Sequence, residues 1–90
     1  MIETVDEKWS RTTNLLFKDE GLIKPDARTR KYQVLSRRSN AWLGEVRWYA
    51  QWRQYTFFPV NSIFDRHCLR EVADFCETKT LEQRAKSQNV

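Results

Sequence analysis

An alternation of large apolar and polar side chains over residues 42–59 limits most strongly what this chain can fold into. The stretch WLGEVRWYAQWRQYTFFP carries seven aromatic rings in eighteen positions. Alternation with a period of two is typical of β-strands, whose successive side chains point to opposite faces. The pattern therefore predicts a strand whose two faces carry, respectively, Trp42, Gly44, Val46, Trp48 and Ala50, and Leu43, Glu45, Arg47, Tyr49 and Gln51.

Two more strands are predicted on either side of this one. The stretch KYQVLSRR is rich in β-formers and ends at Ser39 and Asn40, which suit a hairpin turn. After a tight connection near Trp52, the stretch QYTFFPV alternates again until Pro59, which has no N–H to donate to a ladder. Three antiparallel strands follow from these patterns.

A C-terminal helix is predicted after Asp65, a favourable N-cap residue. Its apolar positions follow the i, i+3, i+4, i+7 spacing of an amphipathic helix. The fold class is therefore α+β, a three-stranded antiparallel sheet packed on one C-terminal amphipathic helix. The apolar positions of this helix are Cys68, Leu69, Val72, Ala73, Phe75 and Cys76.

One small domain of 90 residues is expected, in three parts. Residues 1–29 form an N-terminal arm or an additional helix, capped near Asp6, ended by Gly21 and placing Val5, Trp9, Thr13 and Leu16 on one face. Residues 30–78 form the β-β-β-α core. Residues 79–90 form a frayed tail, because EQRAKSQNV has no apolar face.

The helix can cover only one face of the predicted sheet. Val46, Trp48, Tyr55 and Phe57 are predicted on the covered face as core. The uncovered face is predicted to carry Arg47, Tyr49, Thr56 and Phe58, with Gln33, Leu35 and Arg37 if the first strand keeps its register. In the alternative arrangement, Trp9, Leu15 and Leu16 pack on that face and close a three-layer structure.

Basic residues concentrate in the middle of the chain. The formal net charge is +4, but residues 24–53 hold eight Lys or Arg and two acids, or +6, so the remainder carries −2. Such asymmetry favours an anionic partner for the middle segment, and a solvated basic surface is the alternative.

The residues do not provide the groups that most catalytic sites need, so no enzyme, cofactor, metal or small-molecule substrate is expected. His67 is the only histidine, and Cys68 beside it lies on the apolar face of the helix as an inert thiol. Cys68 and Cys76 stand two helical turns apart, too far for a disulfide. With no secretory signal and no long apolar run, a cytoplasmic protein that does not enter membranes is expected.

The segment Leu43–Phe75 resembles a set of small uncharacterised bacterial, phage or mobile-element proteins. The resemblance rests on LGEVRWYAQWRQYTFFP and on CLREVADF, which are similar to LGxIxWYxxWRxYxFxP and CLxxIAxF in that set. Val46 and Val72 stand where isoleucine is common. The resemblance implies a phage or mobile-element origin, and hence the host cytoplasm, but no activity.

Two functions remain open at this point. The first is DNA or RNA binding, with Arg37, Arg38, Arg47 and Arg53 on phosphates while Tyr49 and Phe58 stack or pack. The second is a protein-binding module that uses the same aromatic face as an interface. Its partner would be a host protein that it inhibits or a second copy of the chain.

Overall fold

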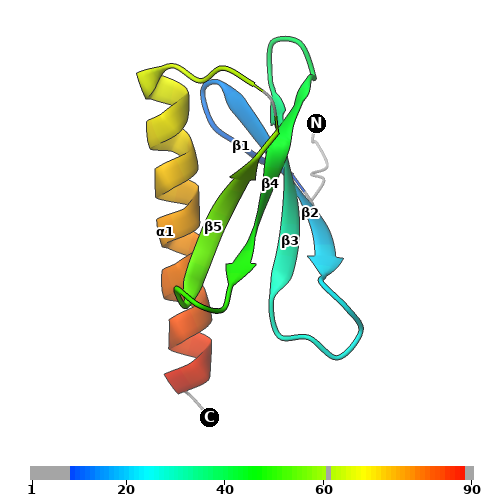
Figure 1. Ribbon diagram of the computed structural model, residues 1–90, viewed down its shortest axis with the longest axis vertical. Helices are drawn as coiled ribbons and strands as arrows, with labels where there is room; N and C mark the ends of the chain where they lie inside the picture. Colours follow the sequence, from blue (N-terminus) through cyan, green and yellow to red (C-terminus); the bar gives the residue numbers. More distant parts are fainter. Residues whose placement is uncertain (1–8, 61, 89–90) are drawn as a thin grey trace, which may run out of the picture.

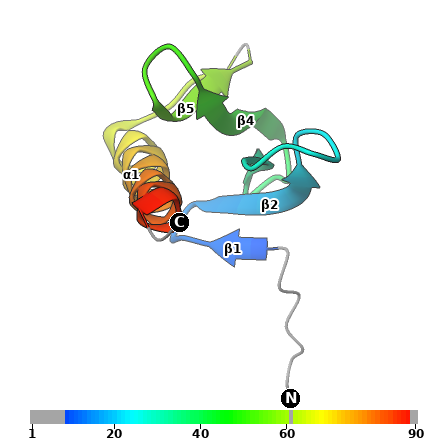
Figure 2. The same cartoon turned by 90° about the horizontal axis from the view of Figure 1, so that it is seen from below.

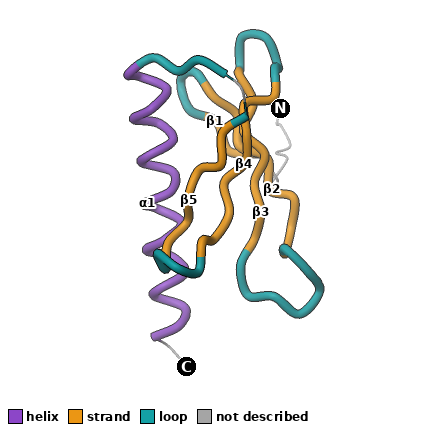
Figure 3. Tube along the Cα trace, viewed as in Figure 1, coloured by secondary structure: helices purple, strands orange, loops and turns teal. Residues whose placement is uncertain are grey.

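The computed structural model describes residues 9–60 and 62–88, which form one antiparallel sheet and one long helix (Figure 1). The strands follow one another across the sheet in sequence order, joined by loops (Figure 3). The α+β class with a C-terminal helix is confirmed, but the sheet has five strands where three were predicted. The elements are β1 (Trp9–Arg11), β2 (Leu15–Leu22), β3 (Arg30–Ser36), β4 (Trp42–Tyr49), β5 (Gln54–Pro59) and α1 (Arg66–Gln88).

The N-terminal segment forms strands β1 and β2, so the predicted additional helix is wrong within the described residues. Leu15 and Phe17 point to the same face and are 1% and 0% exposed, while Leu16 between them lies on the opposite face. A period of two therefore overrides the helical spacing that Trp9, Thr13 and Leu16 suggested. The start proposed for that helix, at residues 5 and 6, lies outside the described residues.

The sheet curls around α1, which lies at the opening of the curl (Figure 2). The helix is joined to both ends of the sheet. Glu71 accepts hydrogen bonds from Thr12 and Asn14 in the β1–β2 turn, and the Thr80 hydroxyl accepts one from the backbone N–H of Tyr55 in β5, at 2.9 Å. The helix thus covers the concave face of the sheet, and among the described residues no element covers the opposite, convex face.

Aromatic rings fill the space between the concave face and the helix. The rings of Phe17 and Phe75 stack with centroids 4.0 Å apart, and the Tyr32 ring meets Phe75 edge-on at 5.0 Å. Val46 and Tyr55 are buried as predicted, with Trp48 and Phe57 packed partly buried beside them. The buried core consists of Leu15, Phe17, Tyr32, Val34, Val46, Tyr55, Val72 and Phe75.

Helix α1 begins where the sequence indicated, because the Asp65 carboxylate accepts a hydrogen bond from the Cys68 N–H at 2.9 Å. That bond lowers the pKa of Asp65.

Two details of the helix were predicted wrongly. Leu69, predicted on the apolar face, is 54% exposed and is not part of the core. The helix continues to Gln88, although fraying was expected from residue 79. The buried Thr80 hydroxyl, which also donates to the Cys76 carbonyl at 2.7 Å, holds this later part against β5. In the part of the chain that the structure describes, no helix combines the length and apolar character that a membrane span needs.

An irregularity in β4 moves two side chains to the faces opposite from those predicted. The register between β3 and β4 shifts at Val34 and Leu35, so Leu35 pairs with Trp42. Leu43 packs against the core, and the Trp42 indole lies outside, where its N–H donates to the Gln33 side chain at 2.5 Å. A bulge adds one residue to a strand and inverts the alternation on one side of it. The predicted alternation therefore holds from Gly44 onward and is wrong before it.

Glu71 is expected to make the stability of the fold sensitive to acid. Partial burial raises its pKa, but the hydrogen bonds from Thr12 and Asn14 outweigh burial and lower the pKa overall. A carboxyl with a lowered folded pKa stabilises the fold fully above its unfolded pKa, and this contribution is lost as the pH falls through the folded value.

We therefore expect Glu71→Gln to reduce the free energy of unfolding at pH 7 by about 1–2 kcal/mol, and by progressively less as the pH falls through the lowered pKa of Glu71, where the wild-type carboxylate becomes protonated. Urea unfolding at several pH values measures the difference. Glu77→Gln, an exposed position on the same helix, is the matched control. An equal loss from Glu71→Gln at acidic and neutral pH would contradict this role of the carboxylate.

Candidate nucleic-acid interface

The convex face is formed by side chains that pair directly across all five strands. One row runs Trp9, Lys18, Gln33, Glu45, Phe58 through successive cross-strand pairs. Directly opposed side chains on neighbouring strands lie about 5 Å apart, so this row is continuous. An aromatic ring stands at each end of the row and a cation stands inside it.

A second row runs beside the first through Arg11, Leu16, Leu35 and Trp42. The Trp42 ring is 53% exposed. We use "convex face" for the outward side chains of the strands. Four of them are cationic and two are acidic, so the face carries +2. The face consists of Trp9, Arg11, Leu16, Lys18, Glu20, Lys31, Gln33, Leu35, Trp42, Glu45, Arg47, Tyr49, Gln54, Thr56 and Phe58.

No third layer covers the convex face within the described residues. Leu15 is buried on the concave side beneath α1, whereas Trp9 and Leu16 are part of the convex face itself. The alternative in which these three residues pack over the sheet is therefore wrong for the part of the chain described.

Arg47 is held in a fixed position on the convex face. Its Nε donates to the Glu45 carboxylate at 2.8 Å, and its guanidinium carbon lies 3.7 Å from the centroid of the Phe58 ring. A guanidinium group has five N–H donors, so the terminal nitrogens can still donate to an approaching acceptor. This placement agrees with the prediction that Arg47 and Phe58 share the uncovered face.

Tyr49 joins Phe58 and Trp52 into an aromatic cluster at the β4–β5 end of the convex face. Its ring lies edge-on to both, with centroid distances of 6.1 Å to Phe58 and 4.9 Å to Trp52. The Tyr49 hydroxyl donates to Gln51 at 2.9 Å. A hollow of about 310 Å³ opens here, lined by Tyr49, Trp52, Thr56, Phe57 and Phe58.

The other predicted site residues lie at the two ends of the sheet and do not form one patch with Arg47. Arg37 and Arg38 lie in the β3–β4 turn, where the Arg37 guanidinium donates to the Thr12 carbonyl at 2.8 Å and so holds the neighbouring turn. Arg53 lies in the β4–β5 turn, at the opposite end of β4. A strand of eight residues separates the two turns by roughly 25 Å.

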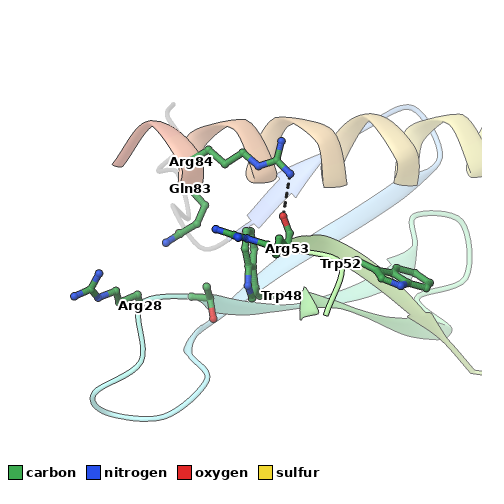
Figure 4. Close-up of a pocket in the computed structure, with 7 residues that line it drawn as sticks. Arg28, Trp48, Trp52, Arg53, Gln83 and Arg84 are labelled. Carbon is green, nitrogen blue, oxygen red and sulfur yellow. Dashed lines mark hydrogen bonds between the residues drawn. The ribbon is translucent and has the colours of Figure 1, made fainter. Parts of the chain in front are cut away.

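A basic groove that the sequence did not reveal surrounds Arg53 (Figure 4). It measures about 680 Å³ and brings together Arg28 from the β2–β3 loop, Arg53, and Arg84 from α1, beside the Trp48 indole. The Arg84 guanidinium donates to the Arg53 carbonyl at 3.0 Å. Arg84 stands four residues after Thr80, and this spacing places it on the helix face toward the sheet. This spacing was the one indication of its position that the sequence contained. Arg28 had no such signal.

Neither cysteine is poised to react. Burial raises the pKa of the Cys76 thiol to about 11, and partial burial together with the Asp65 carboxylate raises that of Cys68. Both are free thiols and protonated at neutral pH. The described residues contain no group of three His, Cys, Asp or Glu side chains placed to hold a metal ion.

Comparison with protein-family models, with curated proteins and with solved structures finds no match to this chain. The resemblance of Leu43–Phe75 to small phage and mobile-element proteins therefore stays a prediction.

Proposed function

We propose that the chain binds single-stranded nucleic acid along its convex face. The observation that carries this proposal is the interleaving of aromatic rings and cations on a face that α1 leaves open. Proteins that bind single strands combine rings, on which bases stack, with cations that follow the phosphates. Trp9 on β1, Trp42 and Tyr49 on β4, and Phe58 on β5 supply the rings. Lys18 on β2 and Arg47 on β4 supply cations on the same face.

A single strand fits this surface better than a duplex. The bases of a duplex stack on one another inside the helix, so protein rings reach them only where the bases are unstacked. The exposed Trp42 ring on the convex face can stack on a base that is turned out of its strand. It cannot reach bases that are stacked inside a duplex. The rings favour a flexible strand laid across β1–β5.

The acidic partners on the convex face leave its cations available to phosphates. The Lys18 ammonium lies 3.8 Å from the Glu20 carboxylate, and the two side chains are 41% and 34% exposed. Such a surface ion pair contributes little and exchanges easily. The Lys18 ammonium also lies 5.6 Å from the Trp9 ring centroid, so it stays beside a stacking surface.

Trp42→Ala is expected to weaken binding of a labelled single strand about tenfold or more, because stacking one base on an aromatic ring contributes about 1–3 kcal/mol. Fluorescence anisotropy with oligothymidylate and oligouridylate at two salt concentrations measures this. Leu69→Ala is the matched control, since Leu69 is 54% exposed and lies on α1. Lys18→Gln should lower the log–log salt slope by about 0.7, the value for one phosphate contact in a single strand.

Absence of wild-type binding at low salt would contradict this proposal. An equal loss of affinity in Trp42→Ala and Leu69→Ala would show that the convex face is not the binding surface. Preferential binding of duplexes would contradict the choice of a single strand.

A protein partner is the second candidate, and the hollow beside Tyr49 and Trp52 favours it. The hollow is lined mainly by rings, and Trp52 at its rim is 61% exposed. Aromatic side chains around a hollow are typical anchors of protein interfaces. If oligonucleotides fail to bind, a concentration-dependent dimer in light scattering that Trp52→Ala abolishes would support the self-association form of this alternative.

A further inference from the structure

We propose that the basic groove between α1 and the β4–β5 turn binds a nucleotide that ends in a phosphate. Such a nucleotide can be free or can be the end of a strand. For a strand end, the inference rests on the function proposed above.

Three guanidinium groups from three separate elements supply the anion site. Arg28, Arg53 and Arg84 line the groove, and the described residues that line it include no carboxylate. The ion pairs found among the described residues involve none of these three. Figure 4 shows Arg53 and Arg84 close together, with Arg28 across the groove from them. A terminal phosphate carries more charge than a phosphodiester and offers three oxygens to such donors.

The Trp48 indole gives the groove a surface for a planar base. Its ring is held edge-on against Tyr55, with centroids 5.4 Å apart, so its orientation is set by the core. Trp48 packs against the core but is only partly buried, so part of its indole is accessible from the groove. The Gln83 side chain adds a hydrogen-bonding amide to the wall. The indole can stack on a base and the guanidinium groups can bind a phosphate, so together they match the two parts of a nucleotide.

The backbone at Arg53 points to the same site. Arg53 has φ 58°, a left-handed conformation that glycine and asparagine adopt far more readily than arginine. Strained residues of this kind cluster at binding sites, where the side chain has a use that offsets the strain. In this chain the position holds a cation at the mouth of the groove.

Trp52 connects the groove to the convex face. It lines the groove on one side and the aromatic hollow with Tyr49 and Phe58 on the other. A strand whose bases stack on the convex face can therefore pass around the β4–β5 turn and place its terminal phosphate among the arginines.

The test compares unphosphorylated, 5′-phosphorylated and 3′-phosphorylated oligothymidylate with thymidine monophosphate, using anisotropy for the strands and calorimetry for the mononucleotide. Wild-type protein should bind one phosphorylated end about tenfold more tightly than the unphosphorylated strand. Arg53→Asn and Arg84→Gln should abolish that preference. Asparagine tolerates the left-handed backbone, so Arg53→Asn removes the charge without disturbing the turn.

Arg66→Gln is the matched control, because it removes one charge from α1 about 27 Å from Arg84. Mononucleotide binding that only the groove variants lose supports the free-ligand form. Equal affinity for all three strands, with no mononucleotide binding, would overturn the proposed phosphate site in the groove. It would not contradict nucleic-acid binding by the convex face. An equal loss in Arg66→Gln and Arg53→Asn would also overturn it, because net charge would then explain the effect. Trp42→Ala reports separately on the convex face.

Discussion

Phe17→Ala is expected to reduce the free energy of unfolding by about 3–5 kcal/mol, the usual result of truncating a fully buried phenylalanine. Phe17 is 0% exposed, and its ring stacks on Phe75 with an interplanar angle of 6°. That contact joins β2 to α1. A domain of 90 residues has a total stability of about 5–13 kcal/mol, so the variant should lose a large share of the stability of the fold.

Urea unfolding followed by far-ultraviolet circular dichroism measures this loss. Phe58→Ala is the matched control on the opposite face of the sheet, where a cation–π contact with Arg47, an edge-on contact with Tyr49 and partial burial are lost. It should reduce stability by about 1 kcal/mol. Phe17→Leu, which keeps most of the volume, should fall between the two. If Phe17→Ala and Phe58→Ala are equally stable, the contact between β2 and α1 contributes little.

Gly44→Ala is expected to reduce stability by about 2–4 kcal/mol, through a steric clash together with backbone strain. A Cβ at Gly44 would lie 2.5 Å from the Phe58 carbonyl oxygen and 2.9 Å from the Phe57 ring. The backbone at Gly44 has φ 148°, which other residues rarely adopt. β5 would have to move away from β4, and this movement would displace Phe58 on the convex face.

Gly21→Ala separates the effect of backbone strain from the effect of the steric clash. Gly21 has φ 93°, but an added Cβ there meets nothing within 4 Å, so only backbone strain of about 1 kcal/mol applies. Thermal unfolding of both variants gives the comparison, and nuclear magnetic resonance shifts of Phe58 report whether β5 moves. A Gly44→Ala protein as stable as Gly21→Ala would show that β5 accommodates the methyl group.

Local patterns were sufficient for the C-terminal half of the fold. The alternation from Gly44 to Phe58 and the helical spacing from Asp65 to Cys76 each depend on neighbours a few residues away. Such patterns can be read without knowing the rest of the chain. The placement of Arg47, Tyr49 and Phe58 on one uncovered face followed directly from that alternation.

Long-range contacts decided what the sequence did not show. Phe17 is ambiguous locally, and it reads as a strand residue only because Phe75, 58 positions later, covers it. The exposure of Leu69 and the extension of α1 past residue 79 depend on where the helix crosses β5, which no local spacing specifies.

The candidate site divides in the same way. The part of the convex face on β3, β4 and β5 that follows regular alternation could be predicted, whereas the part on β1 and β2 could not, because a helix was expected there. The basic groove could not, because Arg28, Arg53 and Arg84 come from three elements whose meeting depends on the curl of the sheet. The bulge that turns Trp42 outward was hidden too, since a glycine in a strand indicates an irregularity but not its direction.

The contact between Thr80 and β5 has a consequence for self-assembly. In an antiparallel strand, alternate N–H groups face away from the partner strand. On β5 these are the positions of Tyr55, Phe57 and Pro59. The N–H of Tyr55 is bound by Thr80, and Pro59 has none, so among these described positions only Phe57 offers a donor. An exposed row of such donors is what lets one sheet extend into another and start a fibril. Here Thr80 occupies one of these donors and Pro59 removes another, so β5 offers a second sheet only a shortened row of hydrogen-bond donors.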